Sequence, residues 1–255
     1  MTEFEKSAII TGGGTGMGAA TAKRLVQDGW NVTIFGRREA KLEEVVAEIS
    51  KPDKTLAVQG DVTNRDDVQK LIDAHMTKFG RLDGLVNNAA IVAGGPIGDV
   101  TIETWKQVMA INVEGVFNTI NMSIEHLKKV GGSIVNVSSV SGVRGDWNFS
   151  PYCASKGAVT NFTHSLALEL GAQGVRINAV APSLTDTDMA TFVTESEEMM
   201  AKVRNRLPLG RAARPEEIAA PIAFLMSDDA SFINGAILPV DGGVMASNGQ
   251  PNFIG

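Results

Sequence analysis

Short apolar runs alternate with longer amphipathic segments along the whole chain. The runs are rich in β-branched residues, which is typical of buried strands. In order, they cover residues 7–11, 31–36, 55–62, 82–88, 132–139, 175–182 and 235–243. In the longer segments, apolar residues recur at spacings of three and four, which predicts helices. These predicted helices cover residues 18–29, 38–49, 65–80, 101–129, 152–171 and 215–227.

Strands that alternate with helices in this way form βαβ units and a parallel sheet. About seven strands are expected, and no linker rich in Pro, Gly or Ser divides them into groups. We therefore expect an α/β protein that is a single Rossmann-type domain over residues 1–255. Its doubly wound parallel sheet would carry helices on both faces.

One segment, residues 184–206, interrupts this alternation. It is polar, shows no clear strand, and lies between the sixth predicted strand and the last predicted helix. Doubly wound folds bind their ligands at the carboxyl ends of the strands. We expect residues 184–206 to form a substrate lid over that edge, which would exclude water during a reaction.

The composition says more about the class of binding partner than about the fold. The 255 residues include 23 Lys and Arg against 29 Asp and Glu, a formal net charge of −6. Nucleic acids and anionic membranes are bound through concentrated positive charge, so neither is expected as a partner. The single cysteine, Cys153, excludes an intrachain disulfide. Without a secretion signal or a bilayer-spanning apolar run, the protein is expected to be cytoplasmic and to bind small molecules.

A glycine-rich turn, TGGGTGMG, joins the first predicted strand to the first predicted helix. Glycine allows positive φ and lets backbone N–H groups approach a diphosphate, whose charge a helix N-terminus also favours. Gly14, Gly16 and Ala19 fit the pattern GxGxxA, whereas Gly12, Gly16 and Gly18 fit GxxxGxG. Both registers predict a dinucleotide site, and the alternative is a tight turn with no ligand.

The end of the second strand distinguishes between the two nicotinamide cofactors. A carboxylate there would accept a hydrogen bond from a ribose 2′-hydroxyl, whereas an arginine would hold the 2′-phosphate of NADP. The strand ends in IFGRR, with Arg37 and Arg38 and no acid. A guanidinium fork suits a dianionic phosphate, so NADP is favoured over NAD. NAD stays possible, because the two arginines could instead be solvated at the start of a helix.

Tyr152, the only tyrosine in the chain, precedes Lys156 by four positions in a predicted helix. This spacing places the two side chains on one helix face, with Cβ atoms about 5 to 6 Å apart. Lowering the phenol pKa from near 10 by about three units takes roughly 4 kcal/mol, which one cation about 4 Å away supplies at an effective dielectric of 20. By itself, however, the spacing is more typical of an amphipathic surface pair.

Other polar residues follow or interrupt the neighbouring elements. Asn88 ends the fourth strand, Asn112 interrupts an apolar helix, and Ser139 ends the fifth strand. With TGGGTGMG, NNAA, YCASK, NAVAPSLTDT and PVDGG, they make the chain resemble the compact branch of the short-chain dehydrogenase/reductase family, from about Ser7 to Gly243. The resemblance implies a Rossmann-fold oxidoreductase that uses a nicotinamide cofactor.

The resemblance also implies a role for each matched residue. Tyr152 would be the general acid/base, and Ser139 would hydrogen-bond the substrate oxygen. Lys156 would lower the pKa of the phenol and hold the nicotinamide ribose, while Asn112 would anchor a water that relays protons. The glycine register would be Gly12, Gly16 and Gly18. The cofactor would contact Gly12, Thr15, Gly16, Met17, Gly18, Arg37, Arg38, Asp61, Val62, Asn88, Ala89, Ala90, Tyr152, Lys156, Pro182, Thr185 and Thr187.

Three positions depart from the family pattern. Ala90 and Ser183 stand where the family has glycine, and neither change removes a catalytic group. Many NADP-dependent relatives carry a basic residue before the position of Gly16, and this chain does not. That absence keeps NAD open as the cofactor.

The side chains expected around Tyr152 are mostly apolar, which suits an uncharged ketone or secondary alcohol. Those expected to contact the substrate are Ile91, Val92, Ser141, Trp147, Phe149, Leu184, Met189 and Phe192. Two alternatives stay open, namely reduction of a 3-oxoacyl thioester and a regulatory protein that binds the cofactor without turnover.

No metal site is expected, because the three histidines are dispersed and there are no paired cysteines. A homotetramer, in which the C-terminal tail meets a neighbouring subunit, is implied by the resemblance alone.

Overall fold

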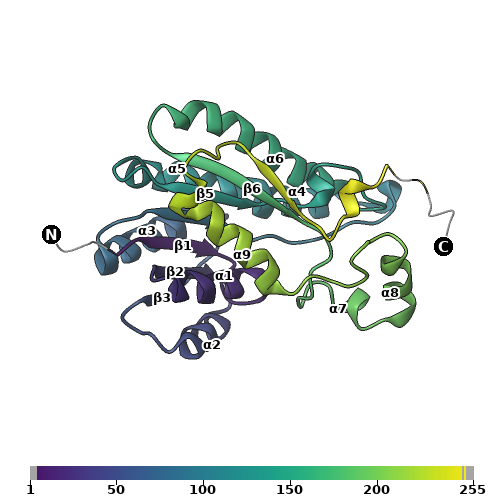
Figure 1. Cartoon of the computed structure of the whole chain (residues 1–255), viewed down its shortest axis with the longest axis horizontal. Helices are drawn as coiled ribbons and strands as arrows, with labels where there is room; N and C mark the ends of the chain where they lie inside the picture. Colours follow the sequence, from purple (N-terminus) through teal and green to yellow (C-terminus); the bar gives the residue numbers. More distant parts are fainter. Residues whose placement is uncertain (1–4, 249, 251–255) are drawn as a thin grey trace.

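Seven parallel strands form one sheet at the centre of the computed structural model, which describes residues 5–248 and 250 (Figure 1). The strands lie in the order β3-β2-β1-β4-β5-β6-β7. Their bounds are β1 Ser7–Thr11, β2 Asn31–Gly36, β3 Thr55–Gln59, β4 Gly84–Asn87, β5 Ser133–Val137, β6 Arg176–Pro182 and β7 Ile237–Val240. The strand order reverses between β1 and β4, and such a switch opens a crevice at the carboxyl ends of the strands. The predicted doubly wound sheet is therefore confirmed.

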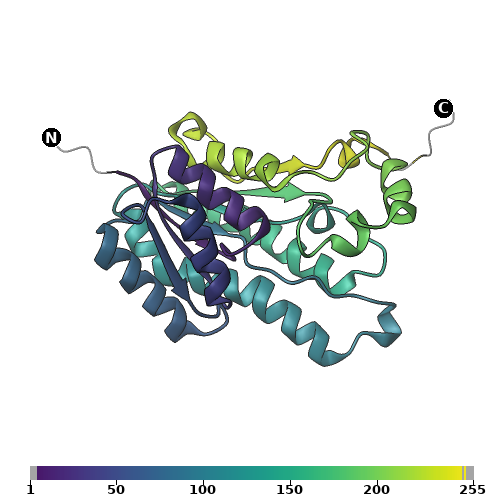
Figure 2. The same cartoon turned by 90° about the horizontal axis from the view of Figure 1, so that it is seen from below.

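Helices cover both faces of this sheet. In Figure 2, the purple α1 and the yellow-green α9 lie on one side and the teal α5 lies on the other. The first face carries α1 (Gly16–Gln27), α2 (Glu39–Ile49) and α9 (Pro215–Met226), and the second carries α3 (Arg65–Phe79), α5 (Gly115–Lys128) and α6 (Ser150–Gly171). Because both faces are covered, the central strands β1, β4, β5 and β6 are buried at nearly every position instead of at alternate ones, and their sequences do not alternate between apolar and polar residues.

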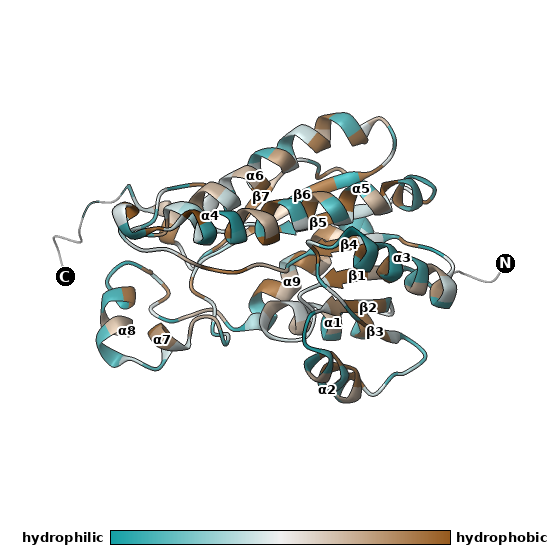
Figure 3. Ribbon diagram, turned by 180° about the vertical axis from the view of Figure 1, so that it is seen from behind, coloured by the Kyte–Doolittle hydropathy of each residue, from teal (hydrophilic) through white to brown (hydrophobic). Residues whose placement is uncertain are grey.

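Each strand divides its side chains between the two cores. In β1, Ala8 and Ile10 pack against the α1, α2 and α9 layer, while Ile9 packs against the α3, α5 and α6 layer. Figure 3 shows the result as hydrophobic strands between helices whose outer faces are hydrophilic. Because successive side chains of a strand point to opposite faces of the sheet, each strand contributes residues to the cores under both helix layers.

The predicted helix over residues 101–129 is not one continuous α-helix. It consists of α4 (Ile102–Met109), a π turn over Ala110–Glu114, and α5. Asn112 lies inside the π turn, where its amide bonds both backbone groups of Ile91: Oδ1 accepts from the N–H at 2.9 Å and Nδ2 donates to the carbonyl at 2.9 Å. The prediction of a single helix was wrong here. A π turn contains one residue more than an α-helical turn, and the spacing of apolar residues does not reveal so small an insertion.

Among the histidines, His75 is fully buried and has a structural role. Its Nδ1 lies 2.7 Å from Thr33 Oγ1, and its Nε2 lies 2.9 Å from the carbonyl oxygen of Arg81. A carbonyl only accepts, so Nε2 donates to it and a neutral ring can accept from Thr33. Burial lowers the pKa of His75 to about 4, which keeps this ring neutral near pH 7.

The segment 184–206 carries two short helices, α7 (Thr191–Thr194) and α8 (Glu197–Arg204), which lie beyond the carboxyl edge of the sheet (Figure 1). The C-terminal tail, which was expected to meet another subunit, falls largely outside the described residues. Within residues 5–248 and 250, no helix is both long and apolar enough to cross a membrane.

Candidate active site

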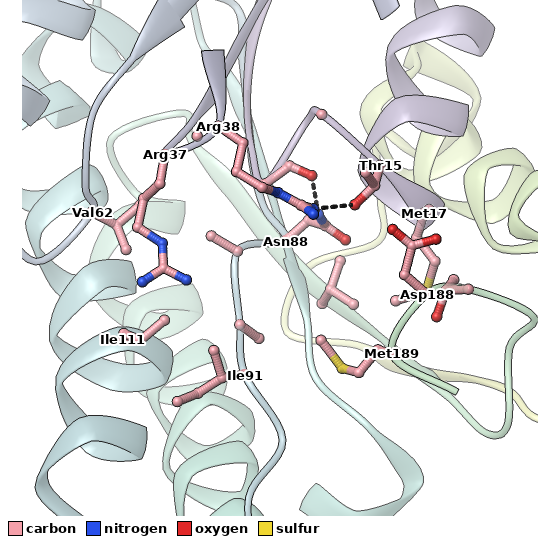
Figure 4. A pocket seen from close by; sticks show the side chains of 18 of the residues that line it. Thr15, Met17, Arg37, Arg38, Val62, Asn88, Ile91, Ile111, Asp188 and Met189 are labelled. Carbon is pink, nitrogen blue, oxygen red and sulfur yellow. Dashed lines mark hydrogen bonds between the residues drawn. The ribbon is translucent and has the colours of Figure 1, made fainter. Parts of the chain in front are cut away.

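A cavity of about 280 Å³ opens at the carboxyl edge of the sheet, across the switch between β1 and β4. The glycine-rich turn and the end of β2 form one part of its wall, and α6 and the start of the lid segment form another (Figure 4). The cavity therefore connects the two sets of motifs that lie far apart in the sequence.

The glycine-rich turn is shaped for close approach of a ligand. Gly12 and Gly16 have φ of 64° and 53°, which side chains rarely adopt, whereas Gly14 is not among the glycines with positive φ. A Cβ on Gly18 would overlap the carbonyl oxygen of Gly12 and lie 2.6 Å from Asn88 Nδ2. Gly18 thus holds α1 against the end of β4, while Gly12 and Gly16 shape the turn itself.

The N-terminus of α1 fits an anionic group. Thr15 stands at the N-cap but forms no side-chain cap, and the first turn of α1 carries no acidic residue. The first N–H groups of a helix lack intrahelical partners, and their partial positive charge attracts phosphate. Since this helix end lines the cavity through Gly16 and Met17, the residues present fit the diphosphate of a dinucleotide.

Three cations gather at the end of β2. Arg37, Arg38 and Lys41 all line the cavity. Arg38 Nη2 donates to Thr15 Oγ1 at 3.3 Å, and Figure 4 shows Arg37 directed toward Val62. Lys41 Nζ binds Glu44 Oε2 at 2.7 Å. Positive charge is therefore concentrated at the end of the cavity that lies far from Tyr152.

Asn88 ties the end of β4 to the glycine-rich turn. Its Nδ2 donates to the carbonyl oxygens of Thr11 and Gly12 at 3.0 and 3.1 Å. The hydroxyl oxygen of Thr11 accepts from the N–H groups of Asn88 and Ala89, both at 3.1 Å. These bonds fix the loop from Asn88 to Ile91 as the floor between the two ends of the cavity.

At the other end, the hydroxyl of Ser139 lies close enough to the phenol of Tyr152 to lower its pKa. Ser139 lies two residues beyond the end of β5, and Tyr152 lies in the first turn of α6. Lys156, one turn further along α6, is buried; its Nζ lies 5.8 Å from the centroid of the Tyr152 ring and donates to the carbonyl oxygen of Val137 at 2.6 Å. The three side chains thus meet where β5 and α6 adjoin.

Burial sets the titration of both groups. Burial raises the pKa of Tyr152 to about 12, the Ser139 hydrogen bond opposes that rise, and the charges of Cys153 and Asp146 add to it. Burial also lowers the pKa of Lys156 to about 8. The expected lowering of the Tyr152 pKa by Lys156 is thus not found in the protein alone; burial of the phenol raises that pKa instead.

Asn112 is joined to the same helix through Ser155. Its Nδ2 donates to Ser155 Oγ at 3.0 Å, and that hydroxyl donates to the carbonyl oxygen of Tyr152 at 2.7 Å. Together with its bonds to Ile91, the amide braces the start of α6 against the floor of the cavity. Asn112 therefore positions the helix segment that carries Tyr152.

Comparison with known proteins identifies this arrangement. A sequence model of the family described as Enoyl-(Acyl carrier protein) reductase matches residues 12–245. Meso-2,3-butanediol dehydrogenase of Serratia marcescens is 43% identical over 249 residues, which make up 98% of this chain and 98% of that protein. The chain belongs to the short-chain dehydrogenase/reductase family. It is an NAD(P)-dependent dehydrogenase/reductase that acts on CH–OH groups.

Two further members of the short-chain dehydrogenase/reductase family show how widely its substrates vary. Cis-4-hydroxycyclohexanecarboxylate dehydrogenase of Sinomonas cyclohexanicum is 41% identical over 244 residues, which are 95% of this chain and 97% of that protein. A crystal structure of an actinorhodin polyketide ketoreductase variant with NADPH matches with a TM-score of 0.90 at 32% identity, covering 94% of this chain and 97% of that one. Uncharged and carboxylated compounds thus both occur among the names of relatives.

Most of the residues predicted to hold the cofactor of this short-chain dehydrogenase/reductase line the cavity. These are Gly12, Thr15, Gly16, Met17, Arg37, Arg38, Asp61, Val62, Asn88, Ala89, Ala90, Tyr152, Lys156 and Thr187. Gly18, Pro182 and Thr185 do not line it. Gly18 is covered by Gly12 and Asn88, and the other two are buried at the end of β6 and just beyond it.

The predicted substrate contacts are brought together less completely. Ile91 and Met189 line the cavity, but Val92, Ser141, Trp147, Phe149, Leu184 and Phe192 do not. The side chains of Trp147 and Phe192 are 85% and 65% exposed. The loop before α6 thus does not reach the cavity, and of the lid segment only Thr187, Asp188 and Met189 line it. Contact of Trp147 or Phe192 with a ligand in the cavity would require their segments to move toward it.

Sequence reasoning missed several cavity residues: Gly36, Lys41, Leu42, Gly60, Ile111, Val137 and Asp188. Gly14, which belonged to the alternative glycine register, and Ser138, beside Ser139, also line the cavity. Lys41 could have been found, because it lies three positions after Arg38 in the first turn of a helix. Val137 enters through its backbone carbonyl, which binds Lys156, and no side-chain pattern signals such a contact. Within the described part of the chain, no cluster of three His, Cys, Asp or Glu residues could hold a metal ion.

Proposed function

We propose that the enzyme transfers a hydride between NADP(H) and an uncharged ketone or secondary alcohol, with Tyr152 as the general acid/base. One observation carries the proposal. The cavity that starts at the glycine-rich turn ends at Tyr152 and Lys156, and the hydroxyl of Ser139 lies close enough to the phenol to lower its pKa. A dinucleotide seated on the turn would therefore reach the two groups that can move a proton.

The proton chemistry follows from this arrangement. A bound nicotinamide cofactor supplies the hydride. In reduction, the hydride reaches the carbonyl carbon, Tyr152 Oη gives its proton to the carbonyl oxygen, and Ser139 Oγ donates a hydrogen bond to that oxygen. In the alcohol-oxidising direction, Tyr152 accepts the proton. Because its pKa is about 12 in the protein alone, the phenol is protonated at neutral pH and suited to act as the acid.

Lys156 and Asn112 would support Tyr152 in different ways. The lysine amine, with a pKa near 8, keeps most of its charge at pH 7 and would stabilise a developing phenolate across the 5.8 Å to the ring. It would also bind the nicotinamide ribose. Asn112 would hold the start of α6 and, by resemblance, anchor a water that relays protons from Lys156 to solvent.

The cofactor would lie along the cavity in a fixed direction. The residues of the turn, Gly12, Thr15, Gly16 and Met17, would hold the diphosphate, and Asp61 and Val62 would border the adenine. Arg37, Arg38 and Lys41 would surround the 2′-phosphate of NADP, which favours NADP because a phosphate dianion needs several donors. Thr187 lies against the glycine-rich turn, since a Cβ on Gly16 would lie 2.9 Å from its Cγ2, and by resemblance it would meet the nicotinamide from the lid.

Charge reversal at Arg37 tests the cofactor preference. Arg37→Asp removes a cation from the ribose end of the cavity and is expected to raise KM for NADPH about thirtyfold, which corresponds to about 2 kcal/mol. KM for NADH should change less than about threefold, since NADH has no phosphate at that position. Lys51→Asp, which reverses an exposed charge beyond the other end of α2, is the control. Equal effects on both cofactors would show that Arg37 does not bind the 2′-phosphate.

The substrate class rests on the apolar side chains of Ile91 and Met189, which line the cavity. A second candidate is reduction of a 3-oxoacyl thioester, which the description of the matching family favours because it concerns acyl carrier protein substrates. A third, regulatory binding without turnover, is disfavoured because Asn112, Ser139, Tyr152 and Lys156 are all present and adjacent.

Turnover decides among the three functions. Purified enzyme is mixed with NADPH or NADH and a panel of diketones, hydroxyketones and 3-oxoacyl thioesters, and loss of the reduced nicotinamide absorbance is followed. We expect the uncharged ketones to be reduced faster than the thioesters. Faster thioester reduction would favour the second function, and tight NADPH binding without any turnover would favour the third.

We further treat residues 1–255 as a single domain, since one sheet contains all seven described strands, and residues 184–206 as a lid that closes over the substrate. Exposed Met189 and Phe192 would then be covered on closure.

We also expect a homotetramer by resemblance. Light scattering should give four times the mass of one chain, and a monomer mass would contradict this assembly.

A further inference from the structure

The loop that precedes α6 carries an acid whose position is fixed. Ser141 Oγ donates to Asp146 Oδ2 at 2.9 Å, and the backbone N–H of Trp147 donates to Oδ1 at 2.8 Å. Ser141 is buried, so one carboxylate oxygen is bound to an interior group although the residue as a whole is exposed. The charge of Asp146 is therefore held in one place and is not free to move away into solvent.

A single residue, Ser141, connects this carboxylate to the hydroxyl of Ser139. The N–H of Ser141, whose side chain binds Asp146, donates to Ser139 Oγ at 3.1 Å. Ser139 in turn lies close enough to Tyr152 to lower the pKa of its phenol, and the charge of Asp146 contributes to the raised pKa of that phenol. The negative charge of Asp146 therefore acts on the phenol of Tyr152.

No opposite charge in the loop neutralises Asp146. The loop contains one cation, Arg144, which is exposed, and no ion pair within the described residues joins it to Asp146. Asp146 is exposed and does not line the cavity, but a charge that is fixed in position and has no ion-pair partner repels other anions that approach it.

We propose that Asp146 is a specificity-determining residue that excludes substrates with a carboxylate close to the reacting carbonyl, as in a 3-oxo acid, so that this enzyme takes uncharged oxo and hydroxy compounds. The proposal rests on the ketone reductase function above and adds the reason for its substrate class. A relative at 41% identity is named for a carboxylated alcohol, so membership of the family alone does not decide the charge of the substrate.

Methyl acetoacetate and acetoacetate form a matched pair of probes, because they share the reacting ketone and differ in one negative charge. The test compares kcat/KM for both probes at low ionic strength, where exposed charges are least screened. Asp146→Asn removes the charge and keeps the loop: Asn Oδ1 can accept from the Trp147 N–H, and Nδ2 can donate to Ser141 Oγ. Asp229→Asn, an equal change of net charge at an exposed site, is the control.

Asp146→Asn is expected to raise kcat/KM for acetoacetate about tenfold, with a change of less than about threefold for the methyl ester. The gain should shrink in high salt, and Asp229→Asn should leave the ratio of the two probes unchanged. An unchanged ratio in Asp146→Asn, or an equal change for both probes, would overturn the proposal. If the wild type reduces neither probe nor any other ketone, the function itself fails, which is a distinct result.

The pH profile separates an electrostatic role from a structural one. The titratable groups near the Tyr152 phenol are Lys156 and Cys153 on α6, Asp146 on the loop, and Asp188, which lines the same cavity from the lid. Removing one negative charge stabilises the phenolate, so the alkaline limb of methyl acetoacetate reduction should shift to lower pH in Asp146→Asn. A profile identical to that of the wild type would contradict the charge effect.

Discussion

Tyr152→Phe is expected to bind NADPH with unchanged affinity and to lose about a thousandfold in kcat. The ring that lines the cavity remains, and only the hydroxyl that gives or takes the proton is removed. The loss follows from the usual contribution of a positioned acid or base, about a hundredfold to ten-thousandfold. Steady-state kinetics with the best ketone of the panel, together with a binding titration of NADPH, measure the two quantities separately.

Cys153→Ala, one position along the same helix, is the control and should keep most of the activity, because Cys153 does not line the cavity. Retention of the wild-type rate in Tyr152→Phe would remove the proposed acid/base role. Since Tyr152 is the only tyrosine, its phenol can also be titrated directly. The protein alone should titrate near pH 12, and the complex with oxidised cofactor well below pH 10, if Lys156 stabilises the phenolate when the cofactor is bound.

Gly18→Ala is expected to have the second large effect, on both stability and cofactor affinity. The added methyl would overlap the carbonyl oxygen of Gly12, and Asn88 Nδ2, 2.6 Å away, cannot withdraw without losing its bonds to Thr11 and Gly12. Overpacking of this kind costs about 3 kcal/mol of unfolding free energy. NADPH binding should weaken at least tenfold, because the turn must shift to make room. Urea unfolding and a binding titration give the two values.

Gly98→Ala provides the matched control, because nothing lies within 4 Å of a Cβ at that position. It should change the unfolding free energy by less than about 0.5 kcal/mol. If Gly18→Ala were as stable as this control and bound NADPH normally, the close packing of α1 on β4 would not be needed for the site.

The layout of the fold was predictable from the sequence because its strands are buried on both faces. Such strands lack a polar residue at every second position, and β1 and β4 are buried at every position. Most residues predicted to bind the cofactor also line the cavity, because a glycine-rich turn and the residues that follow a strand have fixed places at the edge of such a sheet. Because parallel strands all end at the same edge of the sheet, residues that follow different strands come together there.

The reacting end was less accessible to sequence reasoning. The pairing of Asp146 with Ser141 joins two polar residues in an irregular loop, where no periodicity fixes which side chains meet. Trp147 and Phe192 were predicted to line the cavity only because their side chains are apolar. Their exposure depends on the positions of the loop before α6 and of the lid, which the sequence pattern does not specify. Likewise, spacing placed Lys156 beside Tyr152, but the balance between its charge and the burial of the phenol required the three-dimensional surroundings.

The π turn before α5 has a consequence for insertions and deletions. One added residue allows the turn over Ala110–Glu114 to direct Asn112 toward Ile91. Loss of any one residue from that turn would restore an α-helical path and rotate α4 by about 100° relative to α5. Because Val116 and Ile120 hold α5 in the core, the amide would leave Ile91 even though Asn112 itself were retained. Homologues that keep this asparagine but lack the extra residue would therefore not brace α6 in the same way.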